Sequence, residues 1–399
     1  MVNFDKNRII LLSHLNVTLY ALCFWIQIGT LPYLTQKFDV DPITFGNLQT
    51  TFAVVQLMGG PLFGRFGDLF GCKYALALAF ISAFLSYFLL GVANTVFIIF
   101  LSRLPSVFMH AMQGAQMVIT DLTEPSERPD KLGKLGLSYA VGMVLGPVIG
   151  GWCTTYANEQ VAAFVAACGS LLSIVLVVLF IPSNTKGFIL KENTEKTLKK
   201  SKKLLDFDVF TSLIWKNPSA RKLLFVKMLS GLPVGILHGM FSMIALNHFH
   251  LSAEANGYVL SYAGFLSIIS QGLVIGRLTK RGFNEWSLIN GCVAVLCVSN
   301  ALMSILVNGV IGFCISLIPM VVAGAVFSTV IQAMLTKTVQ SEDTGSMLGV
   351  SMAVHSLIRS VSPTIGGFLF QYYGFWSFGA IGFLCNGLLL VYLLISNPR

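Results

Sequence analysis

The sequence predicts an all-α integral membrane protein with twelve transmembrane helices in two similar six-helix bundles. Of its 399 residues, 55% are hydrophobic and only 11% are charged, a composition that excludes a soluble globular surface. Apolar runs of helix-spanning length recur along the chain, whereas a β-barrel would alternate polar and apolar residues in short strands. A motif of glycine and proline inside an apolar run occurs once in each half of the chain, which indicates the two bundles.

Clusters of charged or turn-forming residues separate the apolar segments. Each segment is long enough to cross ~30 Å of hydrocarbon at ~1.5 Å per residue. The first segment is too long for the core of a signal peptide, so we interpret it as a span. The predicted spans are residues 9–35, 44–64, 74–93, 95–118, 133–156, 161–181, 223–248, 257–276, 286–306, 310–336, 346–371 and 376–396.

Basic residues fall on one side of this arrangement. If the N-terminus is cytoplasmic, 22 of the 26 Lys and Arg residues lie in cytoplasmic segments, and Lys37 alone lies outside. The remaining three, Arg103, Lys227 and Arg359, lie within spans. Cytoplasmic loops of membrane proteins are enriched in Lys and Arg, so both termini are predicted to be cytoplasmic. The net charge of +9 then reflects topology, and no nucleic-acid partner is expected.

One long polar stretch divides the chain almost evenly. It predicts an N-terminal bundle in residues 1–182, a basic cytoplasmic linker in 183–222 and a C-terminal bundle in 223–399. The basic side chains of the linker are either solvated or in contact with anionic lipid headgroups. The eight cysteines are scattered singly, without metal-ligand spacing, so we expect packing roles and neither a metal nor a cofactor.

The run from Gly142 to Gly151 contains four glycines and one proline among apolar residues. These residues weaken an isolated helix, but in a membrane small residues let helices approach closely, and neighbouring helices satisfy the backbone groups that proline frees. The motif returns after Ser362. Its predicted gating residues, which we expect to lie where helices slide, are Gly142, Gly146, Pro147, Gly150 and Gly151 in the first copy and Pro363, Gly366 and Gly367 in the second.

A second motif follows the predicted span 44–64, in the segment from Gly64 to Lys73. Its glycines permit a tight turn between two spans, and Asp68 can face basic side chains or the positive N-terminal end of a helix. Such contacts can hold one side of a transporter closed. Further gating residues are predicted on the same side of the membrane: Gly64, Asp68, Gly71, Lys73, Asp121 and Arg128.

Together these two motifs resemble the signature loop and the span-five antiporter motif of the major facilitator superfamily. The resemblance implies parallel six-span halves that rock about a mid-membrane site lined by spans one, four, seven and ten. It implies transport by alternating access and no enzymatic reaction. The segment 101–136 further resembles organic cation transporter-like members of solute carrier family 22. This implies a monomeric, polyspecific organic cation or drug antiporter, coupled to protons, in the apical plasma membrane or an intracellular membrane such as the endoplasmic reticulum.

Charges within the predicted spans favour a different substrate. A cation site in the membrane needs a carboxylate or an aromatic cage, but none of the 17 acidic residues lies well inside a span. Arg103 does, with His110 predicted on the same helical face, and so does Arg359, one turn from His355. The alternative hypothesis is therefore an organic anion, a zwitterion or a lipid-like solute bound through Arg103. A second alternative is a sensor or scaffold that transports nothing.

Polar and aromatic residues of the cavity-lining spans are the candidates for substrate binding. Aromatic rings can hold a cation, and histidines are the side chains whose charge changes near neutral pH. Lys227, only a turn into its span, is expected to snorkel to the interface. Both His355 and Arg359 are assigned to gating. The predicted substrate-binding residues are Tyr20, Trp25, Gln27, Arg103, His110, Gln113, His238 and Gln332.

Overall fold

The computed structural model describes most of the chain. The described residues are 6–124, 127–183, 185, 217–275, 277, 284–339 and 344–396, without the side chains of 129, 130, 275 and 344–346. Most of the predicted linker 183–222 lies outside them. Every regular element within these ranges is a helix, as the apolar segments predict.

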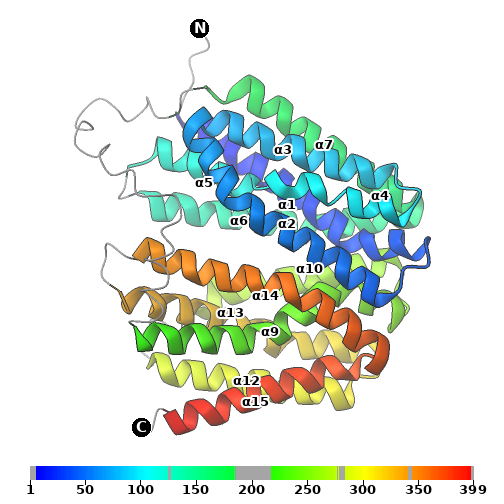
Figure 1. Ribbon diagram of the computed structural model, residues 1–399, viewed down its shortest axis with the longest axis vertical. Coiled ribbons are helices and arrows are strands. Elements are labelled where there is room, and N and C mark those ends of the chain that lie inside the picture. Colours follow the sequence, from blue (N-terminus) through cyan, green and yellow to red (C-terminus); the bar gives the residue numbers. More distant parts are fainter. Residues whose placement is uncertain are drawn as a thin grey trace. The chain divides into compact units, whose positions relative to one another are not determined.

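The helices follow the predicted spans closely, and Figure 1 shows their arrangement within each part of the chain. The boundaries differ from the predicted ones by a few residues at most of the ends. In chain order the helices are α1 (Lys6–Gln36), α2 (Pro42–Phe70), α3 (Cys72–Gly91), α4 (Val96–Leu101), the 3₁₀-helix η1 (Leu104–Phe108), α5 (Ala111–Leu122), α6 (Arg128–Tyr156), α7 (Glu159–Phe180), α9 (Pro218–Asn247), α10 (Ala253–Ile269), the π-helix η3 (Ser270–Ile275), α12 (Glu285–Leu306), α13 (Val310–Lys337), α14 (Thr344–Tyr373) and α15 (Trp376–Ser396).

Within the described ranges, ten helical segments are both long and apolar enough to cross a membrane. Helices α2 and α14 are 29 and 30 residues long but fall outside this set. The physical reason lies in their sequences, since α2 carries Asn47, Gln49 and Gln56 within its apolar run, and α14 carries His355 and Arg359. The prediction of twelve spans therefore stays a prediction for these two helices.

The chain forms two compact units, and each takes a short segment from the other half of the sequence. Of the described residues, unit 1 contains those within Met1–Val40, Thr51–Leu204 and Leu251–Gly264. Unit 2 contains those within Asp41–Thr50, Leu205–His250 and Phe265–Arg399. The first turns of α2 thus belong to unit 2, and the first turns of α10 belong to unit 1.

Unit 1 is built on the close approach of α6 to α1. A Cβ atom at Gly142 would lie 2.6 Å from the Thr18 carbonyl oxygen, and one at Gly146 would lie 2.6 Å from that of Leu22. Gly150, one turn on, lies nearly as close to α1, since its Cβ would be 3.0 Å from the Ile26 carbonyl oxygen. The three glycines form one face of α6, at the four-residue spacing that allows helix backbones to touch.

The exchanged segments pack on the prolines of the repeated motif. In unit 1, Gly257 of α10 lies against the Pro147 carbonyl group, with no room for a side chain. In unit 2, Gly46 of α2 lies against the Pro363 carbonyl group in the same way. The sequence repeat around Pro147 and Pro363 thus corresponds to a repeated packing arrangement, one copy in each unit.

The predicted loop between Gly64 and Lys73 is wrong. Helix α2 continues through this segment to Phe70, and the turn is the single residue Gly71, whose φ of 95° favours glycine. Asp68 is exposed in the last turn of α2. Beyond the turn, the Lys73 ammonium group donates a hydrogen bond of 2.8 Å to the Val178 carbonyl oxygen of α7.

Asp121 lies at the end of α5 and binds two neighbouring segments. Its Oδ2 accepts hydrogen bonds from the Cys72 thiol, at 3.1 Å, and from the Thr185 hydroxyl, at 2.5 Å. Arg128 Nε donates to the Thr123 carbonyl oxygen at 3.2 Å, just before α6. Asp121 therefore ties the end of α5 to the start of α3 and to the residues after α7.

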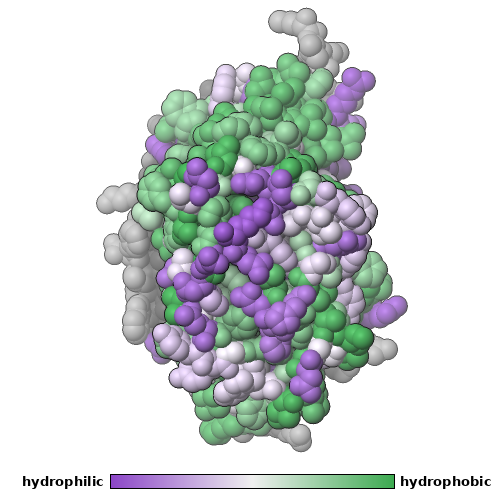
Figure 2. Space-filling model, turned by 90° about the vertical axis from the view of Figure 1, so that its right-hand side faces the viewer, coloured by the Kyte–Doolittle hydropathy of each residue, from purple (hydrophilic) through white to green (hydrophobic). Residues whose placement is uncertain are grey.

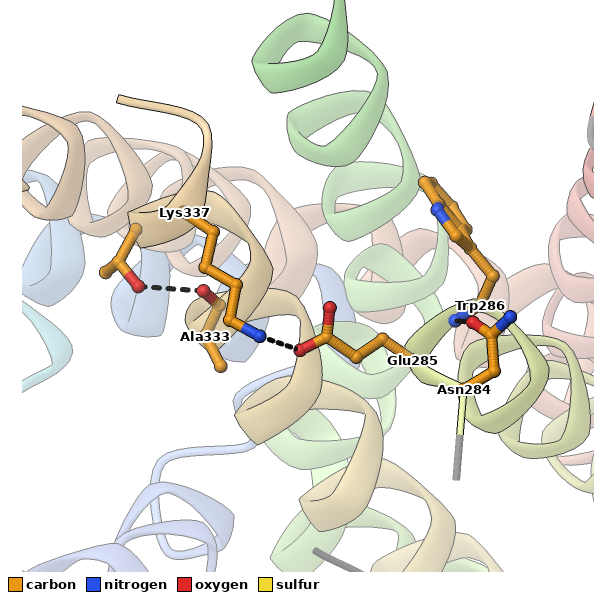
Figure 3. A network of polar contacts seen from close by, with 6 residues as sticks. Asn284, Glu285, Trp286, Ala333 and Lys337 are labelled. Atoms are coloured by element: carbon orange, nitrogen blue, oxygen red, sulfur yellow. Dashed lines mark hydrogen bonds and ion pairs between the residues drawn. The ribbon is translucent and has the colours of Figure 1, made fainter. Parts of the chain in front are cut away.

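Helix ends in unit 2 are fixed by local polar contacts. Figure 3 shows the start of α12, where Asn284 Oδ1 accepts from the Trp286 amide at 3.0 Å. Beside it, Lys337 at the end of α13 pairs with Glu285 at 2.6 Å. Asp41 caps α2: its Oδ1 accepts from the amides of Ile43 and Thr44 at 2.9 and 3.0 Å.

Large apolar side chains cover much of the helix surface. Leu179 and Ile311 are 60% and 75% exposed, respectively. Figure 2 shows hydrophobic residues exposed over much of one face, beside groups of hydrophilic residues. An exposed apolar surface of this extent is stable in lipid but not in water, so the surface agrees with a multi-pass membrane protein.

Replacing Gly146 with alanine is expected to weaken unit 1. The new Cβ would push α1 away from α6, and overpacking of this kind typically costs about 1–3 kcal/mol. Gly324→Ala in α13 is the matched control, because no atom lies within 4 Å of its Cβ position. Thermal unfolding in detergent micelles measures both variants, and equal melting temperatures would contradict the close packing.

Replacing Asp41 with alanine removes the α2 cap and is expected to cost about 1 kcal/mol, whereas Asp41→Asn keeps a capping oxygen. Partial burial raises the pKa of Asp41, but the hydrogen bonds from Thr44 and Ile43 together have a larger, opposite effect. The pKa of Asp41 therefore lies below its ordinary 3.8. The carboxylate therefore stabilises the fold above about pH 3.8, and this contribution is lost as the pH falls. The free energy of unfolding of the parent and of Asp41→Ala should be measured at pH 7 and at pH 3.5. The difference between the two proteins should be smaller at pH 3.5. A constant difference would argue against the cap.

Candidate functional site

A break in the fourth predicted span forms the centre of unit 1. Instead of one helix over 95–118, α4 ends at Leu101, η1 makes one tight turn, and α5 begins at Ala111. Pro105 explains the break, because proline has no amide hydrogen to donate. The expectation that Arg103 and His110 share a face of one continuous helix is therefore wrong.

Arg103 lies at this break, inside the unit. It is 1% exposed, and its Nε and Nη2 atoms have no hydrogen-bond partner among the described residues. Its guanidinium group lies 5.8 Å from the centre of the Phe52 ring and within electrostatic range of Tyr87. No carboxylate in the described part of the chain forms an ion pair with it. A buried cation without a counter-ion is costly, so this position favours an anion.

Two side chains satisfy the backbone that the break leaves open. Tyr20 of α1 donates its hydroxyl hydrogen to the Met109 carbonyl oxygen at 3.0 Å. Gln56 Nε2 of α2 donates to the same oxygen at 3.3 Å. The structure thus places Tyr20 in contact with the backbone beside Arg103. The sequence analysis missed Gln56, although an amide in the middle of an apolar span was a signal for it.

His110 and Gln113 lie against the glycine-rich face of α2. The His110 ring is tilted against Phe63 at 5.5 Å between centroids, and it lies 3.7 Å from where a Cβ of Gly60 would be. Gln113 Nε2 lies 3.3 Å from the corresponding point at Gly64. The glycines of α2 therefore make room for the predicted site residues of α5.

Trp25 and Gln27 are buried in α1, at 8% and 3% exposure. The Trp25 ring packs edge-on against Phe24, with 6.0 Å between the ring centres. Gln27 Nε2 has no hydrogen-bond partner within the described ranges. Gln27 is thus one of several buried polar groups of unit 1, besides Arg103, whose hydrogen-bonding capacity is not fully used.

In unit 2, Gln332 belongs to a hydrogen-bonded chain across three helices. Lys227 Nζ of α9 donates to the carbonyl and hydroxyl oxygens of Ser351 in α14, and the Ser351 hydroxyl donates to Gln332 Oε1 of α13 at 2.8 Å. The expectation that Lys227 snorkels is wrong, because its ammonium group is held inside the unit. The sequence analysis missed Ser351, for which no pattern in the sequence gives a signal.

The other basic candidates of unit 2 lie on the surfaces of α9 and α14. His238, His355 and Arg359 are all exposed. Both His355 and Arg359 lie within electrostatic range of His238. These three residues therefore form one group, and Lys227 of the hydrogen-bonded chain lies within electrostatic range of it, at His355.

An apolar cavity of about 430 Å³ lies between η3, α12 and α13. Val295, Ile318 and Val322 line it, and Ser287 is its main polar neighbour. A binding site usually combines an apolar wall with a few convergent polar groups. This cavity has no charged group in its lining, so we do not assign the site to it.

A profile of the Major Facilitator Superfamily matches residues 14–318 and, in a second match, residues 223–399. The chain belongs to the major facilitator superfamily. Membership makes it a multi-pass membrane transporter, and a transporter rather than an enzyme. The second match covers the C-terminal half alone, in agreement with the repeat seen around Pro147 and Pro363.

Two animal relatives align over nearly the whole chain. Solute carrier family 22 member 18 of Mus musculus is 39% identical over 398 residues, covering 98% of this chain and 97% of the relative. Solute carrier family 67 member A1 of Homo sapiens is 38% identical over 395 residues, with coverages of 97% and 92%.

A more distant relative comes from a bacterium. The class D tetracycline resistance protein of Salmonella ordonez is 26% identical over 367 residues, covering 89% of this chain and 88% of the relative.

Solved structures share the fold. The nucleoside transporter NupG superposes with a TM-score of 0.76 at 14% identity, covering 98% of this chain and 99% of NupG. The human organic anion transporter MFSD10 (TETRAN) superposes with a TM-score of 0.69 at 17% identity, covering 98% and 100%. At these identities the likeness concerns the fold alone.

Proposed function

We propose that this protein is a secondary active transporter that moves a small organic anion, or a zwitterion with an acidic group, by alternating access. The observation that carries this proposal is Arg103, a guanidinium group that is 1% exposed and has two nitrogen atoms without a partner in the described ranges. An acidic substrate would supply the missing counter-ion. Charge-assisted hydrogen bonds between Arg and a carboxylate are among the strongest that proteins make.

The distribution of acidic residues supports the same substrate class. In the described helices the acidic residues lie at or near helix ends, as Asp68 and Asp121 do, or at helix starts, as Glu159 and Glu285 do. Glu159 forms an ion pair with Lys37, and Glu285 forms one with Lys337. No carboxylate is left in the middle of a described helix to bind a cation.

The proposal includes a topology and a coupling ion. Helices α2 and α14 complete twelve spans, both termini lie in the cytoplasm, and the motifs around Pro147 and Pro363 act in gating. Protons are the coupling ion, with histidines such as His110 and His238 as carriers. The transporter acts as a monomer in the plasma membrane or an intracellular membrane, and the positive-inside distribution of Lys and Arg supports the orientation.

A drug or organic cation antiporter is the second candidate. The tetracycline resistance protein among the relatives favours this candidate, because its name describes resistance to a drug. Aromatic rings near the break, such as Trp25 and Phe52, would then have to hold the cation. Arg103, buried 5.8 Å from the Phe52 ring, would repel such a substrate.

Uptake into proteoliposomes separates these candidates. With an inward proton gradient, which drives proton symport, the parent protein should accumulate p-aminohippurate, an anion. With an outward proton gradient, which drives proton antiport, it should still exclude tetraethylammonium, a cation. Arg103→Gln should lower anion uptake about tenfold or more, since hydrogen bonds to charged groups contribute ~1.5–3 kcal/mol. Arg8→Gln is the control, because Arg8 is an exposed basic residue at the start of α1.

Tetraethylammonium uptake that Arg103→Gln leaves unchanged would overturn the anion proposal and favour the cation antiporter. If no solute of a broad anionic and cationic panel showed saturable flux, the remaining hypothesis would be a sensor or scaffold.

A further inference from the structure

Unit 2 contains a second group of basic residues that the fold brings together. On α14, Ser351, His355 and Arg359 follow one another at every fourth residue, so they share one face of the helix. On α9, Lys227 and His238 lie about three helical turns apart. We call Lys227, His238, His355 and Arg359 the basic stripe.

Helices α9 and α14 contact each other along the length of this stripe. Lys227 Nζ lies 3.1 Å from the Ser351 carbonyl oxygen. Further along, a Cβ at Gly235 would lie 2.6 Å from Ser362 Oγ, and one at Gly239 would lie 2.9 Å from the Pro363 ring. Residue numbers rise together on the two helices, so they run parallel, and the basic groups of one lie beside those of the other.

The members of the stripe repel one another. Arg359 and His355 lie within electrostatic range of His238, and Arg359 and Lys227 lie within range of His355. Helices α13 and α15 pack against the stripe and contribute Gln332 and Asn386 on their facing sides and no acidic residue. The start of α2 packs on α14 at Pro363, beyond Arg359, and the acidic residue there, Asp41, caps α2. Helix α9 and the described side chains of α14 also lack carboxylates. An anion is the group that would relieve this repulsion.

The side chains of the stripe are both charged or titratable and exposed, so they do not face lipid. His238, His355 and Arg359 are exposed, and Lys227 is partly so, within apolar helices. Charged side chains that face hydrocarbon are costly and rare, and in membrane proteins they face water or a polar ligand instead. The exposed face of the stripe is therefore a polar surface inside the span of α9 and α14.

We propose that the basic stripe is a binding site for the acidic group of a soluble organic anion, and that protonation of His355 and His238 tightens this binding. The inference rests on the proposed function and adds a substrate-binding site in unit 2 to the one at Arg103. It assigns Arg359 to substrate binding rather than to gating. Because a bound anion favours the protonated imidazoles, anion and proton bind cooperatively.

Direct binding tests the stripe separately from transport. The probe is 1-naphthalenesulfonate, which stays anionic from pH 5.5 to 7.5, so any pH dependence must come from the protein. Calorimetry on the purified full chain in detergent, without added lipid, should show tighter binding at pH 5.5. Arg359→Gln should weaken binding about tenfold or more, and Arg359→Lys should restore part of it. Arg277→Gln, an exposed arginine after η3, should bind like the parent.

The pH dependence of binding in a His355 variant gives a second measurement, which can be made even if Arg359→Gln fails to fold. His355→Gln should reduce the gain in affinity between pH 7.5 and 5.5, whereas His250→Gln, in the exposed loop after α9, should keep it. Parental binding and parental pH dependence in Arg359→Gln and His355→Gln, with binding lost in Arg103→Gln, would overturn the stripe and leave the proposed function standing. If the parent binds no sulfonate at either pH but transports tetraethylammonium, the proposed function fails as well.

Discussion

The contact of α6 with α1, backbone against backbone, is the constraint on which unit 1 depends. Apolar burial cannot hold two helices together in lipid, because the lipid is as apolar as the side chains. Gly142, Gly146 and Gly150 instead bring the helix axes close enough for extensive van der Waals contact. In unit 2, Gly366 lies against Met240 and Ile236 of α9 in the equivalent place. The same physical solution has been used once in each unit.

Polar side chains complete this close packing by binding the backbone groups that the helix break leaves open. With the backbones held by glycine contacts, side chains such as Tyr20 and Gln56 are available to satisfy the opened backbone at Met109. The break places Arg103 between the end of α4 and the start of η1, in the interior of the unit, where it is 1% exposed. The burial of this cation is therefore a product of the surrounding helix packing, and the same packing keeps its surroundings free of carboxylates.

Much of the fold was accessible from the sequence, because apolar length and small-residue patterns act locally. The helix boundaries and the equivalence of Pro147 and Pro363 are of this kind. The break at η1 was less accessible: Pro105 signals a bend, but whether a helix bends or breaks depends on partners such as Tyr20 that are distant in sequence. The turn at Gly71 was misplaced for a related reason, since glycines that look like a loop at Gly64 serve helix contacts instead.

The candidate site shows the same division. Arg103 stood out from the sequence as a charge within an apolar run, and the structure places it in a buried position. Lys227 did not, because a lysine one turn inside a span usually reaches the interface, and only the position of Ser351 on another helix decides otherwise. The relation of His355 and Arg359 to His238 likewise depends on the register between α9 and α14, which no local pattern encodes.

The exchange of short segments between the two units also bears on how the protein is made. Asn256 donates a hydrogen bond to the Gly29 carbonyl oxygen at 3.0 Å, and Ser261 donates one to that of Val144 at 2.5 Å. Domains ordinarily fold in order as the ribosome releases them. Here unit 1 remains incomplete until Gly264 has been synthesised, well after the last residue of α7. The compact unit around α6 thus contains chain from both halves of the sequence, so its last contacts can form only after the first turns of α10 have been made.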